Sequence, residues 1–270
     1  MNDLLIKATN YGGVEEEDGA TAQPLTLAEE FFLLLLDRDS GKLPKSVIPL
    51  YHGFIGLAIG ELLLMGKLTL FKGTNFSHKN KMLVKVIDAS KTHNQFLNYI
   101  LSKISKCKSR SIAGCILHIT DGMYQNNIKK VNYAIGRELV EKGILFTKNR
   151  KTGFFGTKYS YNFLDHHQKT KIEKVCSSLV SVAFDEHKCD GFSREIILML
   201  TLRQYNYVTT TSLISKFLHA NFPINQHETI HKNIKMLDKK YSTTNAMDVP
   251  MDKMLYTILL GIRGAYDSEF

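Results

Sequence analysis

The feature that most constrains the fold is a long apolar segment, Val47–Met65, which reads VIPLYHGFIGLAIGELLLM. It is long enough to cross a bilayer. It also contains Pro49, His52 and Glu61, and a carboxylate at the centre of a bilayer costs about 3 kcal/mol. A second run, Phe31–Leu36, is apolar on every helical face. We therefore expect both segments to be buried helices at the centre of a bundle.

Hydrophobic periodicity and end signals predict the other elements. Thr26 and Glu29 fit a capping box at the first helix, and Gly66 and Gly143 follow two later helices as caps. Further helices are expected at about 94–104, 126–142, 168–184, 193–203, 210–218, 226–237 and 251–262, with strands at 67–72 and 82–87 and a hairpin over 144–163. The short apolar segment 111–118 receives no assignment.

The predicted fold is mainly α. It is a single helical domain with a four-helix core, surrounding amphipathic helices and small β-hairpins. This domain is assigned to residues 24–270. Residues 1–23 are rich in glycine and carboxylates and are predicted to be a disordered acidic N-terminal tail, because such a composition buries little apolar surface.

Positive charge is concentrated in one part of the chain. The formal net charge is +9, and residues 79–174 alone hold nineteen basic and six acidic groups. Residues 175–270 hold ten of each. This asymmetry favours nucleic acid, anionic lipid or an acidic protein as the partner. The alternative is a solvated lysine-rich face without a partner.

No catalytic signature is present in the sequence. There is no glycine-rich phosphate loop, no Gly-x-Ser-x-Gly elbow and no His-Glu-x-x-His motif. The four cysteines form no Cys-x-x-Cys pair. Cys189 lies two residues after His187 but lacks a second pair of ligands at zinc-site spacing. We therefore expect no enzyme, no catalytic residues, no cofactor and no metal site.

The first candidate contact in the basic part of the chain is the helix predicted over 126–142. It contains Lys129, Lys130 and Arg137, and the seven-residue spacing of Lys130 and Arg137 places them on one helical face. Ammonium and guanidinium groups satisfy several phosphate oxygens, so such a cluster fits a phosphorylated head group. An ordinary solvated helix face is the alternative.

The second candidate contact is the hairpin that follows. Arg150 and Lys151 precede Phe154 and Phe155 across Gly153. Cations near an anionic leaflet contribute about 1 kcal/mol each, and exposed rings add apolar burial, so this hairpin is a candidate membrane contact. In the alternative interpretation both phenylalanines point inward from a strand.

The helix and the hairpin together also fit a different class of protein. A helix carrying Lys129, Lys130, Asn132 and Arg137, followed by a basic hairpin, resembles a recognition helix and the wing of a winged-helix protein. A nucleic-acid-binding protein that uses the 126–163 helix and hairpin is therefore the alternative function.

Three segments carry a family resemblance. They are Leu25–Leu36 (LTLAEEFFLLLL), Gly56–Leu68 (GLAIGELLLMGKL) and Arg137–Leu145 (RELVEKGIL). In this order and spacing they resemble the Golgi phosphoprotein 3 family of peripheral Golgi adaptors. The resemblance extends over about residues 25–264.

The resemblance implies a mostly helical domain that binds phosphatidylinositol 4-phosphate on the cytosolic face of Golgi membranes and is otherwise cytosolic. A hydrophobic hairpin tip, here within about 145–163, enters the membrane. Such proteins capture the cytosolic tails of glycosyltransferases and link them to coatomer, which retains those enzymes in the Golgi during vesicle traffic. A homo-oligomer is compatible with this role, and no nucleic acid is expected.

The family's binding residues are only partly present. The position of the family Trp falls on Ser46, and the position of its first Arg falls on Ile55. The family's N-terminal arginine cluster, which meets coatomer, is absent, because residues 1–30 hold seven acidic groups and one basic group. The first of the family's two later cations matches Lys129, whereas the second falls on Asn132. Lys130 and Arg137 lie near them, and Tyr51 is the nearby aromatic residue. These five residues make up the predicted phosphoinositide site.

Overall fold

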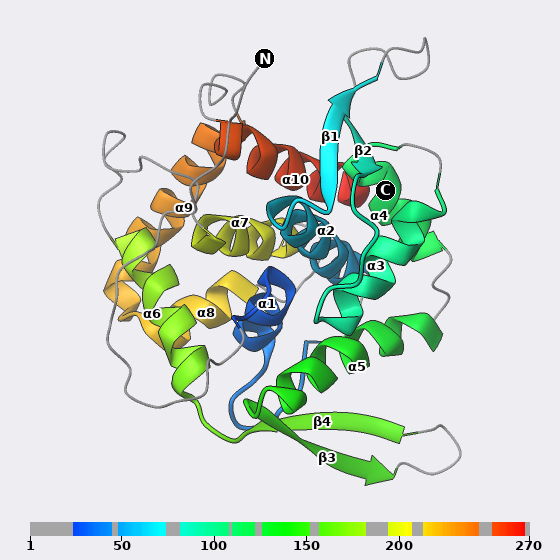
Figure 1. The fold of residues 1–270 in the computed structure, drawn as a ribbon. Coiled ribbons are helices and arrows are strands. Elements are labelled where there is room, and N and C mark those ends of the chain that lie inside the picture. Colours follow the sequence, from blue (N-terminus) through cyan, green and yellow to red (C-terminus); the bar gives the residue numbers. More distant parts are fainter. Residues whose placement is uncertain are drawn as a thin grey trace, which may run out of the picture.

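The structure is a computed structural model, and it confirms the mainly α fold. It describes residues 24–44, 48–73, 82–107, 110–121, 126–151, 157–181, 194–206, 213–242 and 250–267. Within these residues, helices surround a central helix, and two small antiparallel sheets lie at the periphery (Figure 1). The predicted N-terminal tail, residues 1–23, lies outside the described residues.

The elements follow the predicted order along the chain. They are α1 (Leu27–Leu35), α2 (Ile48–Leu64), β1 (Leu68–Lys72), β2 (Met82–Val86), α3 (Gln95–Ser105), α4 (Ile112–Asp121), α5 (Asn126–Glu141), β3 (Leu145–Lys151), β4 (Thr157–Phe163), α6 (His167–Ser181), α7 (Arg194–Asn206), α8 (Leu213–Asn221), the 3₁₀ helix η2 (Ile224–Gln226), α9 (His227–Ser242) and α10 (Pro250–Asp267). The unassigned segment 111–118 lies largely within α4.

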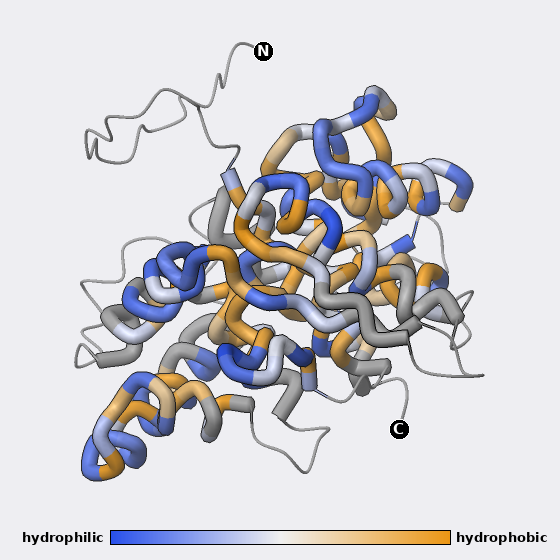
Figure 2. Tube along the Cα trace, turned by 90° about the horizontal axis from the view of Figure 1, so that it is seen from below, coloured by the Kyte–Doolittle hydropathy of each residue, from blue (hydrophilic) through white to orange (hydrophobic). Residues whose placement is uncertain are grey.

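The apolar segment predicted to be buried is confirmed as the central helix, α2. Residues 50–60 are all buried, and α2 contacts α1, α3, α4, α7 and α10. Gly56 and Gly60 lie against Ile262 and Ile258 of α10, so these two helices pack closely. Among the described helices, none is long and apolar enough to cross a membrane. In the outer helices, hydrophilic and hydrophobic residues alternate along the chain (Figure 2).

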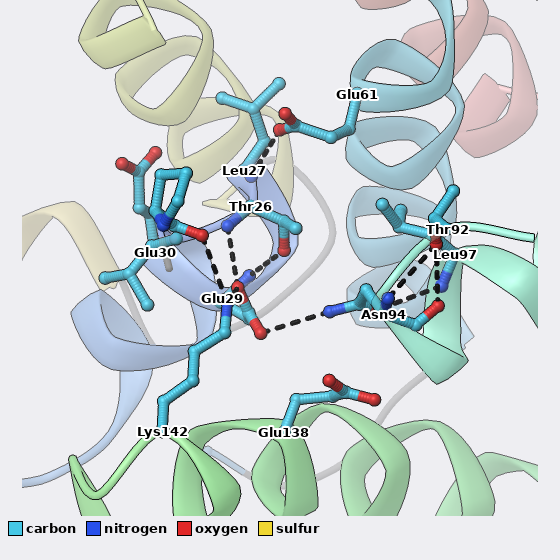
Figure 3. Close-up of polar contacts among 12 residues, drawn as sticks. Thr26, Leu27, Glu29, Glu30, Glu61, Thr92, Asn94, Leu97, Glu138 and Lys142 are labelled. Carbon is cyan, nitrogen blue, oxygen red and sulfur yellow. Dashed lines mark hydrogen bonds and ion pairs between the residues drawn. The ribbon is translucent and has the colours of Figure 1, made fainter. Parts of the chain in front are cut away.

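A buried polar network holds the N-terminus of α1 (Figure 3). The predicted capping box is present, with Thr26 and Glu29 each bonded to the other's backbone amide. The Glu29 carboxylate, 1% exposed, also accepts from Asn94 Nδ2 at 3.1 Å and from Lys142 Nζ at 2.7 Å. Asn94 is the N-cap of α3, and Lys142 directly follows α5. One carboxylate therefore connects α1, α3 and α5.

Arg194, the first residue of α7, holds the same end of α1 from the other side. Its guanidinium donates to the Leu25 carbonyl at 2.8 Å and pairs with Glu30 at 3.2 Å. It also pairs with Glu61 of α2 at 3.3 Å, and Glu61 accepts from the Leu27 backbone N–H at 2.8 Å. These bonds tie α1, α2 and α7 together at one point.

Lys169 of α6 satisfies the opposite end of α1. Its ammonium, on a side chain only 5% exposed, donates to the carbonyls of Leu33, Leu34 and Leu36 at 2.7, 3.1 and 2.8 Å. These carbonyls have no partner within the helix, because the last turn of a helix leaves its acceptors open. Glu173 lies 3.4 Å from the ammonium and balances its charge. A cation at a helix C-terminus is also favoured by the helix dipole.

Replacing Lys169 by Met should therefore destabilise the fold. The change leaves three carbonyls, two of them in buried hydrogen bonds, without their donor. Breaking a buried ionic contact in this way costs about 3–5 kcal/mol. Urea unfolding measures the loss. Lys171→Met, an exposed lysine on the same helix, is the matched control and should change stability by less than about 0.5 kcal/mol. Equal effects of the two substitutions would contradict the role given to Lys169.

Glu138 of α5 should make stability depend on pH. Its carboxylate accepts from the Gln95 backbone N–H at 2.7 Å, and burial, followed by the nearby Glu29 charge, raises the pKa of Glu138. A folded-state pKa above the unfolded value gives stability that is complete below the unfolded pKa and is lost as pH rises through the folded pKa. Glu138→Gln keeps an acceptor for the Gln95 N–H and removes the loss of stability at rising pH. The variant should be at least as stable as the parent at pH 7, with its advantage shrinking toward pH 4. Thermal unfolding at pH 7 and pH 4 measures this difference in stability. A Glu138→Gln variant that is less stable than the parent at pH 7 would contradict the effect assigned to Glu138.

Candidate anion-binding surface on α5 and the β3–β4 hairpin

Helix α5 packs against the bundle with its apolar face, and a polar residue lies beside that face. Val131, Ile135 and Leu139 recur at helical spacing and are buried. Asn132, beside this apolar face, is only partly exposed. The sequence places the basic residues of α5 at the remaining positions, so the helix is amphipathic.

The structure brings together two of the predicted binding residues, Tyr51 and Asn132. Asn132 Nδ2 donates to the Tyr51 hydroxyl at 3.2 Å, which connects α5 to α2. Tyr51 is only 1% exposed, so its ring belongs to the core. The Asn132 Oδ1 atom is also buried and has no hydrogen-bond partner among the described residues. An unpaired buried acceptor costs about 1–3 kcal/mol, and a donor from a ligand would relieve that cost.

The predicted cations of α5 lie on different sides of the helix. Position 129 is one turn before Asn132, whereas Arg137 is five residues after it and is rotated by about 140°. Arg137 Nε donates to Glu141 at 2.7 Å, and this hydrogen bond raises the pKa of the Arg137 guanidinium. Lys130 is two turns from Arg137 and shares its side of α5. Of these three positions, 129 therefore shares the side of α5 that carries Asn132, and Arg137 is turned away from it.

The hairpin is held against α5 by Tyr161 of β4. The Tyr161 ring lies on Gly136, where no side chain keeps the two elements apart, and its hydroxyl is 3.5 Å from the Asn132 carbonyl. On its other side the ring contacts Phe32 of α1, edge to face, with centroids 5.6 Å apart. Its backbone N–H donates to the Gly41 carbonyl at 3.0 Å. Tyr161 thus connects β4, α5 and α1.

The two faces of the hairpin differ near its base. Strands β3 and β4 pair antiparallel, with Leu145 opposite Phe163 and Phe146 opposite Asn162. Leu145 and Phe163 are buried, whereas Phe146 is 40% exposed and Leu164, just after β4, is 61% exposed. The hairpin therefore has an apolar outer surface at its base. Sequence reasoning missed this surface, although alternation along a strand would predict it.

The predicted membrane-contact residues lie further along the same hairpin, beyond its apolar base. Arg150 and Lys151 are the last residues of β3, opposite Lys158 and Thr157, and their side chains are outside the described part of the structure. Phe154 and Phe155 lie outside the described residues. In Figure 1 the hairpin projects from the bundle below α5.

The described residues contain no group of His, Cys, Asp and Glu that could hold a metal ion. Burial raises the pKa of the Cys115 thiol to about 12, so this cysteine is a poor nucleophile at neutral pH. The prominent surface features are instead a basic helix and a projecting hairpin.

Comparison with known proteins identifies the family. The family model for Golgi phosphoprotein 3 (GPP34) matches residues 27–205, well over half of the chain. A VPS74-like protein of Dictyostelium discoideum is 34% identical over 263 residues, which cover 94% of this chain and 99% of that protein. The chain belongs to the Golgi phosphoprotein 3 family, a family of non-enzymatic adaptors, and its role is therefore associated with the Golgi and with trafficking. The resemblance found in the sequence is confirmed.

Gly136 and Tyr161 are residues whose importance the sequence analysis missed. An isolated glycine inside a helical pattern often marks a close packing contact, and Gly136 was the available signal. Its partner could not be identified from the sequence, because Tyr161 is one of several aromatic residues in the hairpin.

Gly136→Ala should loosen the hairpin. A methyl group at this position overlaps the Tyr161 ring, and overpacking costs about 1–3 kcal/mol. Gly264→Ala in α10 is the matched control, because its methyl would meet only Ala113 Cβ, at 3.4 Å. Hydrogen exchange should show faster exchange in β4 for Gly136→Ala alone. Unchanged exchange in β4 would contradict the role of this contact.

Proposed function

We propose that the protein is a peripheral membrane adaptor that binds phosphatidylinositol 4-phosphate on the cytosolic face of the Golgi. In this proposal α5 and the β3–β4 hairpin form the membrane-facing surface. The observation that carries the proposal is the Tyr161 contact, which fixes the basic hairpin to the basic helix. Two charged elements held as one surface attract an anionic bilayer more strongly than either does alone.

Further features support a head-group site near Asn132. Lys129 is one turn away, where an ammonium can pair with a phosphate as a point charge. The buried Asn132 Oδ1 lacks a partner among the described residues, and an inositol hydroxyl is a donor of the required kind. The exposed Phe146 and Leu164 would add apolar contact with the membrane interface beside the charged groups.

The second part of the proposal concerns cargo. The adaptor captures the cytosolic tails of glycosyltransferases and so retains these enzymes in the Golgi. Family membership supports this role in general terms, without naming particular tails. Coatomer is proposed as a further partner, with a contact different from the family's arginine cluster, because residues 1–23 have five acidic groups and one basic group.

Vesicle flotation tests the membrane-binding part. Vesicles with phosphatidylinositol 4-phosphate should recruit the protein, and Lys129→Ala with Lys130→Ala should weaken recruitment at least several-fold, because each cation near an anionic leaflet is worth about 1 kcal/mol. Lys232→Ala with Lys235→Ala, two exposed lysines on α9, removes the same charge elsewhere and should have a smaller effect.

Equal recruitment to neutral and anionic vesicles at low salt would rule out the membrane proposal. A tight complex with duplex DNA that weakens steeply as salt rises would favour the winged-helix alternative. Equal effects of the α5 and α9 substitutions would show general charge attraction without a specific surface.

A further inference from the structure

A second basic surface lies on α3, outside the proposed membrane site. Tyr99, Lys103 and Lys106 follow one another at helical spacing on the exposed side of this helix. Lys103 Nζ lies 5.5 Å from the centroid of the Tyr99 ring, and Lys106 is the C-cap of the helix. We call these three residues the α3 stripe. It combines two cations with an aromatic ring that is 37% exposed.

Within the part of the chain that the structure describes, no carboxylate pairs with the cations of the α3 stripe, Lys103 and Lys106. Two further exposed cations, Lys85 of β2 and Arg110, lie on segments that contact each other, because Arg110 forms a β-bridge with Val84, next to Lys85. Strand β2 also contacts α3. Such a cluster attracts a run of carboxylates.

The chain itself contains such a run. Glu15, Glu16, Glu17 and Asp18 are consecutive and hold four of the five acidic groups within residues 1–23. The first described residue after this run is Pro24. The same chain therefore contains an acidic segment and a basic helix of opposite charge.

The acidic segment joins the fold beside the start of α3. The Pro24 carbonyl accepts from Lys142 Nζ at 3.1 Å, and the same ammonium pairs with Glu29. The other oxygen of Glu29 accepts from Asn94 Nδ2 at 3.1 Å, and Asn94 caps α3 (Figure 3). Pro24, the first described residue after the acidic run, is thus connected to the start of α3 through Lys142 and the buried Glu29 carboxylate.

The distances allow the acidic run to reach the stripe. Glu15–Asp18 lies six to nine residues before Pro24, and an extended chain of that length spans about 20–30 Å. Lys103 and Lys106 lie nine and twelve residues after Asn94, about 14–18 Å along the helix axis. From an attachment point beside Asn94, the extended run is therefore long enough to reach the two lysines.

We propose that Glu15–Asp18 docks on the α3 stripe of the same chain. The docked carboxylates neutralise Lys103 and Lys106. Because α3 packs beside α5 (Figure 1), docking lowers the positive potential next to the proposed membrane surface. The docking itself is independent of the proposed function, whereas its consequence, weaker attraction to anionic membranes, rests on that function.

Zero-length carbodiimide cross-linking of the full chain tests the docking. The reagent joins a carboxylate to a lysine amine only when the two are in contact. Mass spectrometry should find Glu15–Asp18 linked mainly to Lys103 and Lys106, in a monomer, at a yield that is independent of protein concentration and falls at high salt. Links spread over all exposed lysines, or links only between two copies, would overturn the proposal.

Matched variants connect the docking to its consequence. Glu15→Gln, Glu16→Gln, Glu17→Gln and Asp18→Asn together neutralise the run, which should raise binding to phosphatidylserine vesicles several-fold. The gain should shrink in a Lys103→Gln, Lys106→Gln background and persist in a Lys232→Gln, Lys235→Gln background on α9. An equal gain in both backgrounds would show a general effect of net charge and overturn specific docking. Absence of vesicle binding in every variant would contradict the proposed function, and the cross-links would still decide the docking.

Discussion

The arrangement of this protein depends on how the two ends of α1 are satisfied. A helix of nine residues leaves a large share of its backbone groups without partners in the helix, and α1 is buried on almost every side. Charged side chains satisfy these groups. Glu29, paired with Lys142, accepts from the Thr26 N–H at one end, and Lys169, paired with Glu173, donates to the carbonyls at the other. Because each of these groups is buried, the helices that supply them are held in fixed positions.

The proposed membrane surface depends on this arrangement. Lys142 directly follows α5, so its contact with Glu29 fixes the end of that helix against α1. Tyr161 then packs between Phe32 of α1 and Gly136 of α5, which sets the position of the hairpin. The bundle thus presents together a charged helix and a hairpin with an apolar base, which is the arrangement that the proposed membrane adaptor needs.

Much of the fold could be predicted from the sequence, because its signals are local. The capping box at Thr26 and the glycine caps Gly66 and Gly143, both with positive φ, are set by neighbouring residues. Helix ends were predicted less well: α10 continues to Asp267, beyond the predicted 262, because tertiary packing extends a helix past its apolar pattern. The long-range contacts of Lys169 were not predicted, since nothing local to a lysine shows which carbonyls it reaches.

Hydrogen exchange on vesicles containing phosphatidylinositol 4-phosphate tests the central claim most directly. If α5 and the hairpin form one membrane surface, binding should slow exchange in 126–141 and in 145–163 together. The α9 segment 227–242 should be unchanged. Protection of only one of the two elements, or protection centred on α9, would contradict this account.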